Sequence, residues 1–347
     1  MKTTLCTLYN SLYLDKGLVL YDSLKECAQD FELYVLCMDE KCYEVLSNIG
    51  EDRLKPLHLV DVENDKMLIA KSNRTVAEYC WTCSSRLIQY ILETYQSSCC
   101  TYIDADMYFY NDPQVLVDEM IKAGKSVMMV PHRFTERNQS LADKVGTYCV
   151  EFNCFKNDAA GLEVLNHWHN QCLECCSNIG DGIHWGDQKY MDEWPVLYPD
   201  KVHVCENPGA GIAPWNIEWY QYSNTNDNVV IYKKDMRIIP IIFYHFQDIK
   251  YLTRKEINIS INKNSKNIDY QLVKKLYLPY LLTIERTKVF ISARYGIDLL
   301  IKNHPSQKKQ KGIRSLIKST CVVKFAYNLI KKNMPYIICI NDFGKNI

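Results

Sequence analysis

The sequence has no excess of either charge. Its 347 residues include 41 basic and 41 acidic side chains, which gives a formal net charge of zero. Proteins that bind nucleic acid usually carry a basic excess, so this composition argues against a nucleic-acid partner. With 47% hydrophobic and 24% charged residues, the chain is typical of a globular protein with a substantial core.

Long apolar runs are also missing. No stretch of about 18 apolar residues occurs, so we expect no membrane-spanning helix. The residues Met1-Lys2-Thr3-Thr4 lead directly into an apolar run without a small-residue cleavage pattern. We therefore expect a first core strand here rather than a signal peptide, and a cytoplasmic location.

The 16 cysteines form no spaced framework. We interpret them as reduced and mostly buried, as in a cytosolic protein. Cys80 and Cys83 form a C-x-x-C pair, and no second pair lies at a suitable spacing, which argues against zinc. The glycine-containing loop at 208–216 has no following Gly-Lys-Ser or Gly-Lys-Thr, so it is not a phosphate-binding P-loop.

Short apolar strands alternate with helical patterns through the first 250 residues. We expect strands at 4–9, 31–38, 57–60, 100–104, 126–131, 148–156 and 238–245, and helices at 15–27, 40–48, 75–95, 114–123 and 160–177. This alternation predicts an α/β domain whose mixed, mainly parallel sheet is flanked by helices. Sheets of this kind bind ligands at the carboxyl ends of their strands.

Two acids directly follow one of the predicted strands. Asp104 and Asp106 come after the apolar run that ends at Ile103. Buried carboxylates are costly unless they are compensated, and a divalent cation that bridges to a diphosphate compensates them well. Mg²⁺ and Mn²⁺ prefer oxygen ligands of this type. An acid-rich turn with a capping role is the alternative.

Two further segments could complete such a site. His245 ends the strand predicted at 238–245 and could be a third metal ligand, or a hydrogen-bonded histidine at a strand end. Asp187 and Gln188 lie in a loop, where an acid and an amide can bind sugar hydroxyls. Alternatively, Asp187 caps a helix over 189–193.

Three more side chains are candidates for donor binding. Arg133 follows a predicted strand and could donate to phosphate, or could belong to a surface turn. Trp215 and Asn216 lie in a loop rich in glycine and proline. A tryptophan face can stack on a sugar ring, whereas a buried hinge tryptophan is the alternative.

Taken in order, these segments resemble the nucleotide-diphospho-sugar transferases of the GT-A fold, near glycosyltransferase family 8. The matching segments are the end of the first strand from Thr7 to Asn10, Asp104-Ala-Asp106, Pro131-His-Arg133, Gly186-Asp-Gln188, Ala213-Pro-Trp-Asn216 and Tyr244-His-Phe246. The resemblance implies that Mn²⁺ or Mg²⁺ binds Asp104, Asp106 and His245. It also implies that Asp187 and Gln188 lie near the reacting carbon of the donor sugar.

The same resemblance implies that Thr7 and Asn10 contact the nucleoside. It further implies a hexosyltransferase that uses a UDP-sugar and retains anomeric configuration. We expect a glycan or a lipid-linked acceptor. The chain departs from family 8 in two ways: Ala213-Pro-Trp215 precedes His245 and no Lys-Pro-Trp follows it, and Gln247-Asp248 replaces the glycine expected soon after the histidine. Inversion with Asp187 as base stays open, and the alternative function is a non-catalytic binder of sugar nucleotides or glycans.

The C-terminal part is basic. We expect a transferase domain at 1–250, a helical extension packed on it at 251–300, and a basic amphipathic tail at 301–347. In the tail, ten lysine or arginine side chains oppose the single acid Asp342. This pattern fits a peripheral hold on the anionic inner face of a membrane, or equally a solvated helix packed on the catalytic domain.

Overall fold

The computed structural model describes residues 2–179, 184–225, 228–251, 256–261 and 267–299, together with the backbone of 337–339. The central sheet consists of β1 (Thr3–Tyr9), β2 (Phe31–Cys37), β3 (Leu54–His58), β4 (Cys99–Ile103), β6 (Val127–Pro131), β7 (Tyr148–Lys156) and β8 (Val202–Val204). The longer helices are α1 (Leu14–Cys27), α2 (Glu40–Ile49), α4 (Asp65–Lys71), α5 (Val76–Tyr95), α6 (Gln114–Lys122), α8 (Ala159–Glu174) and α10 (Tyr270–Tyr295).

Shorter elements connect and extend this framework. The helical ones are α3 (Leu59–Val62), α7 (Leu141–Val145), α9 (Trp194–Leu197), η1 (Ser11–Tyr13), η2 (Glu136–Asn138), η3 (Lys189–Glu193) and η4 (Ile217–Trp219). The remaining strands are β5 (Met107–Phe109), β9 (Tyr220–Tyr222), β10 (Val229–Tyr232), β11 (Arg237–Pro240), β12 (Phe243–His245), β13 (Lys250–Tyr251), β14 (Glu256–Asn258) and β15 (Ile337–Cys339).

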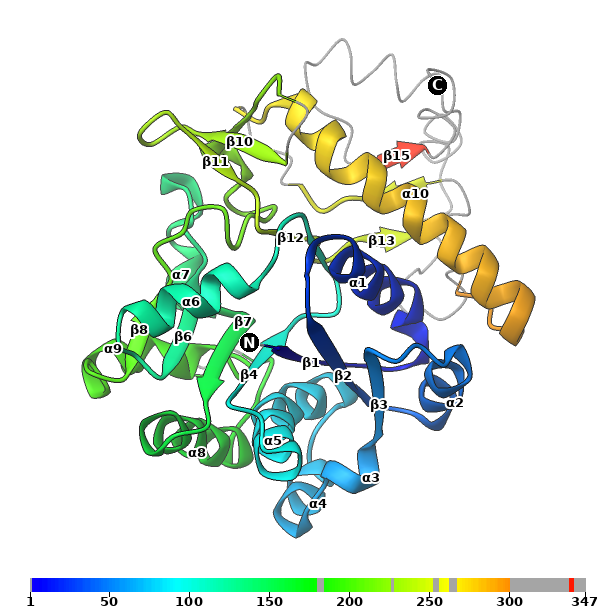
Figure 1. Ribbon diagram of the computed structural model, residues 1–347, viewed down its shortest axis with the longest axis vertical. Helices are drawn as coiled ribbons and strands as arrows, with labels where there is room; N and C mark the ends of the chain where they lie inside the picture. The colour runs from blue at the N-terminus through cyan, green and yellow to red at the C-terminus, as the bar shows by residue number, and fades with distance from the viewer. Residues whose placement is uncertain are drawn as a thin grey trace.

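The seven strands of the central sheet lie in the order β3-β2-β1-β4-β7-β6-β8 (Figure 1). The pairs β2–β3, β1–β2, β1–β4 and β6–β8 are parallel, whereas β7 runs antiparallel to both β4 and β6. The sequence-based expectation of a mixed, mainly parallel sheet is therefore confirmed.

Helices cover both faces of this sheet. One apolar cluster joins the strands to α1, α2 and α6, and a second joins them to α4, α5 and α8. Side chains alternate between the clusters along each strand, so Leu5 of β1 packs in the first cluster and Cys6 in the second. The molecule is thus a three-layer α/β structure with the core on both sides of the sheet.

Local sequence signals fix several of the helix ends. At the start of α5 the Thr75 hydroxyl accepts the N–H of Glu78, and the Glu78 carboxylate accepts the N–H of Thr75. Helix α2 begins after Asp39, whose carboxylate accepts the N–H of Cys42, and ends at Gly50, which has φ of 69°. These caps explain why the expected boundaries of both helices agree with the structure.

The strands expected at 57–60 and 238–245 were assigned incorrectly. Strand β3 ends at His58, and the chain then forms the helical turn α3. The run 238–245 divides into β11, which pairs with β10, and β12, which pairs with β5. The N–H groups of Ile241 and Ile242, which separate the two strands, donate to the carbonyls of Asn228 and Gly209. The backbone therefore leaves one sheet and enters another.

A third apolar cluster lies beside the central sheet. Within the region 251–300, which was expected to be a helical extension, α10 packs against α1 and against β12 (Figure 1). The rings of Phe246 and Tyr280 stack with centroids 3.7 Å apart, and the Tyr277 hydroxyl lies 2.8 Å from that of Tyr244. Helix α10 therefore supports the strand that ends at His245.

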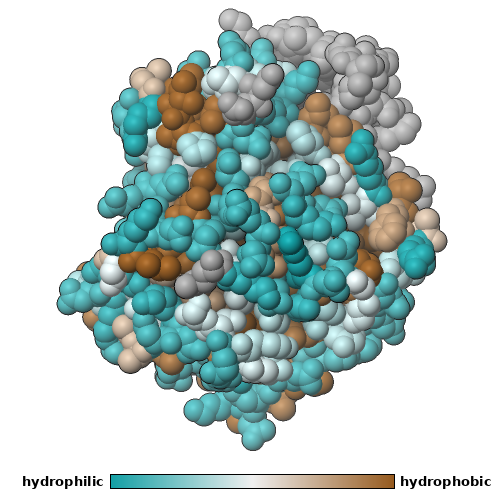
Figure 2. Space-filling view, in the orientation of Figure 1, coloured by the Kyte–Doolittle hydropathy of each residue, from teal (hydrophilic) through white to brown (hydrophobic). Residues whose placement is uncertain are grey.

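The tail expected at 301–347 lies outside the described residues, apart from the backbone of β15, which pairs with β14. In the described part of the chain, no helix is long and apolar enough to cross a membrane. The fourteen described cysteines are free thiols, and most of them are buried. On the surface, hydrophobic side chains gather over β10 and β11, where Met236 and Ile238 are more than half exposed (Figure 2).

Candidate metal and donor site

The site is built where β4 ends and the short pair β5–β12 begins. Asp104 and Asp106 occupy the turn between β4 and β5. Strand β12 runs antiparallel to β5 and places His245 opposite Met107. The N–H of Phe246 donates to the carbonyl of Asp106 over 2.9 Å. Backbone pairing therefore brings His245 to the two acids across more than a hundred residues of sequence.

The side chains of these three residues converge. His245 Nε2 lies 3.1 Å from Asp106 Oδ1 and 3.7 Å from Asp104 Oδ2. Around an octahedral cation with ligands at about 2.1 Å, neighbouring ligand atoms lie about 3 Å apart. Two carboxylates and an imidazole suit Mn²⁺ or Mg²⁺ in chemistry as well as in spacing. The donor set therefore fits the expected divalent cation.

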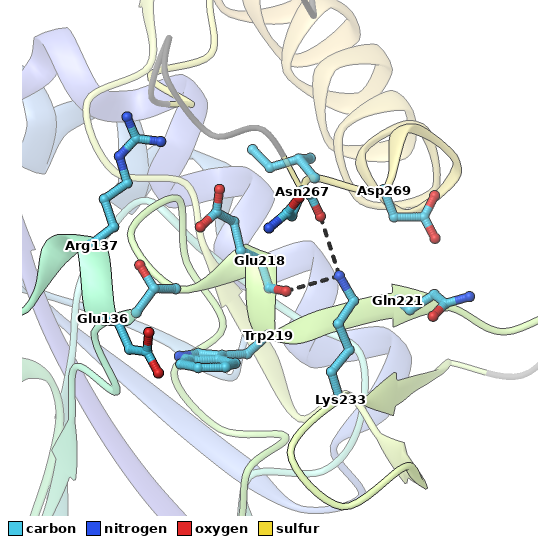
Figure 3. A pocket seen from close by; sticks show the side chains of 10 residues that line it. Glu136, Arg137, Glu218, Trp219, Gln221, Lys233, Asn267 and Asp269 are labelled. Carbon is cyan, nitrogen blue, oxygen red and sulfur yellow. Dashed lines mark hydrogen bonds between the residues drawn. The ribbon is translucent and has the colours of Figure 1, made fainter.

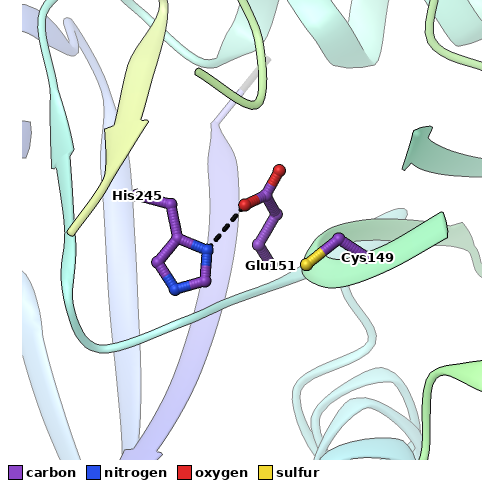
Figure 4. Close-up of side chains that lie close together, drawn as sticks. All are labelled: Cys149, Glu151 and His245. Atoms are coloured by element: carbon purple, nitrogen blue, oxygen red, sulfur yellow. Dashed lines mark hydrogen bonds and ion pairs between the residues drawn. The ribbon is translucent and has the colours of Figure 1, made fainter. Parts of the chain in front are cut away.

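The opposite ring nitrogen of His245 meets a buried acid. Nδ1 lies 2.6 Å from Oε2 of Glu151, whose side chain is fully buried in β7 (Figure 4). Gly211 gives this carboxylate room, because a Cβ at that position would lie 2.7 Å from Glu151 Oε1. A carboxylate on the remote nitrogen of a metal-binding histidine fixes the orientation and tautomer of the ring.

A second possible ligand group shares His245. Ligand atoms of Cys149, Glu151 and His245 lie within 4.8 Å of one another (Figure 4). This group is buried, and burial raises the pKa of the Cys149 thiol above its ordinary value, which opposes the thiolate that a metal requires. Asp104 has a side chain that is 29% exposed, so the Nε2 side is the one that a nucleotide-bound cation can reach.

Electrostatics separate the two acids. Burial raises the pKa of Asp104 to about 6, and the neighbouring carboxylates add to this effect against the attraction of His245. Burial also acts to raise the pKa of Asp106, but the charge and hydrogen bond of His245, together with Lys16, bring it to about 2. The chain thus holds concentrated negative charge that His245 and Lys16 neutralise in part.

Lys16 is a cation that the sequence reasoning missed. Its Nζ lies 3.8 Å from Asp106 Oδ2 and 4.2 Å from the centre of the Tyr13 ring, and its side chain is buried. The adjacent Asp15 accepts a hydrogen bond from the Tyr251 hydroxyl over 2.8 Å. Lys16 follows the first strand in sequence, but only the packing of α1 shows that it reaches the acids.

Asp187 also lies within electrostatic reach of the acids. Its carboxyl group is buried, and burial raises its pKa to about 7, while a hydrogen bond from Ser84 opposes this and the charge of Asp104 adds to it. Among the described residues, its Oδ2 has no hydrogen-bond partner. The alternative role as a helix cap is not observed, because η3 follows Gln188 without a side-chain cap.

Gln188 follows Asp187 in sequence, and only one end of its side-chain amide has a hydrogen-bond partner among the described residues. Its Nε2 donates to the carbonyl of Val145 over 2.5 Å. In the part of the chain that the structure describes, no hydrogen bond to its amide oxygen is present. That oxygen is available to a ligand.

Arg133 and Asn216 form what we call the carbonyl clasp. The Arg133 guanidinium donates to the carbonyls of Ala210, Cys205 and Asn207 at 2.6, 2.8 and 3.0 Å. The fully buried Asn216 amide donates to the carbonyls of His132 and Gly211, and its oxygen accepts the N–H of Ala213. These hydrogen bonds give both residues a structural role, and their expected contact with the donor stays a prediction.

Trp215 connects the clasp to the acidic cluster, which is the group formed by Asp104, Asp106 and His245. Its indole N–H donates to the carbonyl of His132 over 2.8 Å. Its ring meets that of His245 edge to face, with centroids 5.4 Å apart. Trp215 therefore forms a wall beside the candidate metal ligands.

The two residues expected to contact the nucleoside lie on and just after β1. Thr7 is fully buried, and its hydroxyl has no partner within the described residues. Asn10 caps η1, because its side-chain oxygen accepts the N–H of Leu12 over 3.1 Å. No contact brings either residue to the acidic cluster in the described parts of the chain, so their role in nucleoside binding stays a prediction.

Glu151 is the second functional candidate that the sequence reasoning missed. It was passed over as one residue of the strand expected at 148–156. A sequence signal was present, because Glu151 is an acid within an otherwise apolar stretch that includes Cys149, Val150 and Phe152. A charged residue in a buried strand needs a partner, and here the partner is His245.

Two proteins of Bacillus subtilis (strain 168) are similar to this chain over most of its length. YfnD is 31% identical over 283 residues, which covers 81% of this chain and 88% of YfnD. YfnF is 31% identical over 292 residues, which covers 81% of this chain and 93% of YfnF. Both are described as uncharacterized proteins. No model of a protein family matches the chain.

Several solved structures resemble the chain in fold. Mouse xyloside xylosyltransferase 1 in its apo form has a TM-score of 0.47 and 12% identity, covering 72% of this chain and 98% of that one. The galactosyltransferase LgtC with donor and acceptor sugar analogs has a TM-score of 0.44 and 12% identity, covering 71% of this chain and 87% of that one. These neighbours are GT-A type glycosyltransferases, and the likeness concerns the fold alone.

Proposed function

The chain belongs to the protein family of YfnD and YfnF of Bacillus subtilis, and we propose that it is a metal-dependent glycosyltransferase. It moves a hexose from a nucleotide diphosphate sugar, most simply a UDP-sugar, to a glycan or a lipid-linked acceptor. Asp104, Asp106 and His245 hold Mn²⁺ or Mg²⁺ in this proposal. Retention of anomeric configuration is favoured over inversion.

One observation carries the proposal. Two carboxylates and an imidazole nitrogen converge at the carboxyl end of β4, with separations of 3.1 and 3.7 Å that suit one divalent cation. The Glu151 carboxylate behind His245 adds the support that metal-binding histidines usually have. In sheets of this type, the carboxyl ends of the strands are where ligands bind.

The metal ion, when bound, would offset the negative charge that develops on the departing diphosphate. Lys16 supplies a second positive charge next to Asp106, in the role that the sequence had suggested for Arg133. Glu151 holds the His245 ring in one orientation and keeps Nε2 directed at the acids. Trp215 covers the histidine and limits the access of water from that side.

Asp187 and Gln188 are the proposed contacts on the side of the donor sugar. In a retaining reaction, the free amide oxygen of Gln188 lies near the reacting face and the leaving phosphate accepts the acceptor's proton. In an inverting reaction, Asp187 removes that proton as the base, and its pKa of about 7 suits this work near neutral pH. The stereochemistry of the product separates the two routes.

Thermal unfolding with Mn²⁺ and UDP tests the proposal directly. We expect UDP to raise the unfolding temperature when Mn²⁺ is present, and to do so far less in EDTA, because ligand binding stabilises the folded state. A panel of nucleotide sugars, assayed for Mn²⁺-dependent hydrolysis, then identifies the donor. Absence of both stabilisation and hydrolysis across the panel would overturn the assignment.

The basic residues of 301–347 are proposed to hold the enzyme at the anionic inner face of a membrane, where a lipid-linked acceptor is present. Apart from the backbone of 337–339, this segment lies outside the described residues, and the sequence alone supports the idea. Flotation with anionic liposomes, comparing the full chain with a truncation at residue 300, tests it. Equal flotation of the two proteins would reject it.

A further inference from the structure

A hollow in the surface lies apart from the acidic cluster. It has a volume of about 890 Å³, and Figure 3 shows the side chains that line it. They come from η2, from η4 and β9, from the end of β10, and from the residues just before α10. The hollow thus lies among the small three-stranded sheet and its neighbours, outside the seven-stranded sheet.

An aromatic ring held in a fixed position lines this hollow. The indole N–H of Trp219 is shared between the carbonyls of Arg133 and Phe134 at 3.1 and 3.4 Å. The ammonium of Lys234 lies 4.6 Å from the ring centre. A tryptophan that is half-buried and anchored in this way loses little entropy on binding, and its face can pack on the C–H surface of a sugar ring.

Two carboxylates beside the ring have no partner among the described residues. Glu136 and Glu218 make no side-chain hydrogen bond or ion pair with any described residue, and both line the hollow (Figure 3). By contrast, Asp269 caps α10 and accepts the N–H of Tyr222, and Lys233 donates to two backbone carbonyls. Free carboxylates are strong acceptors for hydroxyl groups.

The balance of charge limits the ligand. Besides the acids, Arg137 and Lys233 also line the hollow, so neither sign dominates there. A nucleotide or another polyanion would face two unpaired carboxylates, whereas a neutral sugar offers hydroxyl donors to both. The Gln221 side chain adds a group that can donate and accept. These features together select a neutral glycan.

The hollow and the acidic cluster share two chain segments. Trp215 contacts His245, and four residues later Trp219 lines the hollow. On the facing segment, the His132 carbonyl accepts from Trp215, and the Asn138 amide donates back to the carbonyl of Trp215 over 2.8 Å. A glycan in the hollow is therefore held by the same loops that wall the proposed reaction centre.

We infer that this hollow binds a neutral oligosaccharide segment of the acceptor, away from the sugar that reacts, through the Trp219 face and the carboxylates of Glu136 and Glu218. The role of the hollow in binding the acceptor rests on the proposed function. The binding site itself is defined by the side chains of the hollow and can be measured without any turnover.

Saturation-transfer NMR on the full chain tests the site, with maltotriose, cellotriose and chitotriose as probes. We expect at least one of these neutral sugars to bind the unmodified protein. Trp219→Ala should weaken that binding about tenfold or more, because one aromatic platform often carries much of the affinity. The double variant Glu136→Gln/Glu218→Gln keeps the side-chain shapes and should weaken binding as well.

Glu174→Gln is the matched control, because Glu174 is exposed at the end of α8 and does not line the hollow. This variant should bind sugar as the unmodified chain does. The inference is overturned if no probe binds, if both hollow variants bind normally, or if UDP with Mn²⁺ displaces the sugar. Stabilisation by UDP and Mn²⁺, measured on the same unmodified protein, reports the proposed function separately. A protein with that stabilisation and no sugar binding would refute the subsite alone.

Discussion

The acidic cluster at the end of β4 and the carbonyl clasp are both in contact with Trp215, but they use their polar groups differently. In the clasp, the guanidinium of Arg133 and the amide of Asn216 are taken up by backbone carbonyls and one backbone N–H. In the cluster, Asp106 faces His245 and Lys16, and Asp104 faces His245, so charged side chains rather than backbone carbonyls are the main partners. The polar groups of the clasp have hydrogen-bond partners, whereas the acidic cluster keeps negative charge that a cation can neutralise.

The largest effect is expected from the acids. Asp104→Asn or Asp106→Asn should lower Mn²⁺-dependent hydrolysis of the donor by more than about 100-fold, because each removes a charged metal ligand. Loss of a residue that only supports a ligand typically costs about 10- to 100-fold, and loss of the ligand itself should cost more. Steady-state hydrolysis at saturating donor measures this. Asp200→Asn, at an exposed position, is the control. Full activity in both cluster variants would show that the acids do not hold a functional metal.

A substitution in the clasp should lower the free energy of unfolding. Asn216→Ala removes three hydrogen bonds of a fully buried amide and leaves the Gly211 carbonyl and the Ala213 N–H unpaired, whereas the His132 carbonyl keeps its bond from Trp215. We expect a cost of about 2 to 3 kcal/mol. Urea unfolding at neutral pH gives the value, with the exposed Asn224→Ala as control. A loss below about 0.5 kcal/mol would mean that the clasp does not hold these loops.

A change behind His245 tests whether support for the ring matters. Glu151→Gln should weaken Mn²⁺ binding by about 10- to 100-fold, because the amide cannot attract the ring N–H as the carboxylate does. Titration calorimetry with Mn²⁺ measures this, with Glu174→Gln as control. Unchanged affinity would point to a purely structural role for Glu151.

The smallest effect contrasts two histidines. His245 has acids on both ring nitrogens, and although burial opposes it, Asp106 raises its pKa well above the usual value. The ring of His169 forms a hydrogen bond with Ser85, and burial, with Arg86 and Lys66, lowers its pKa to about 4. The stability that neutral His169 contributes is present above pH 6.5 and is lost as the pH falls toward 4, because the unfolded chain takes up the proton first.

The unmodified chain should therefore lose about 2 kcal/mol more than His169→Gln between pH 7 and pH 4.5. Urea unfolding of both proteins at the two pH values measures the difference. An equal loss in both would show that His169 does not titrate abnormally.

The elements of the α/β layer follow from local patterns, and so their types were predictable. The Thr75–Glu78 capping pair and the Asp39 and Gly50 caps mark helix ends in the sequence itself. The run 238–245 was misassigned because its apolar pattern is continuous, whereas the change of hydrogen-bonding partner at Ile241 and Ile242 depends on loops elsewhere. Local periodicity carries no information on which strand a segment pairs with.

The sequence by itself determined the candidate acids, because two carboxylates after a buried strand are costly without a cation. It also determined the alternation of strands and helices that puts such a turn at the ligand-binding end of a sheet. The tertiary structure decided which other side chains join them. It brought in Lys16 and Glu151 by packing, and it assigned the polar groups of Arg133 and Asn216 to backbone carbonyls, because hydrogen-bond partners are chosen by proximity in space.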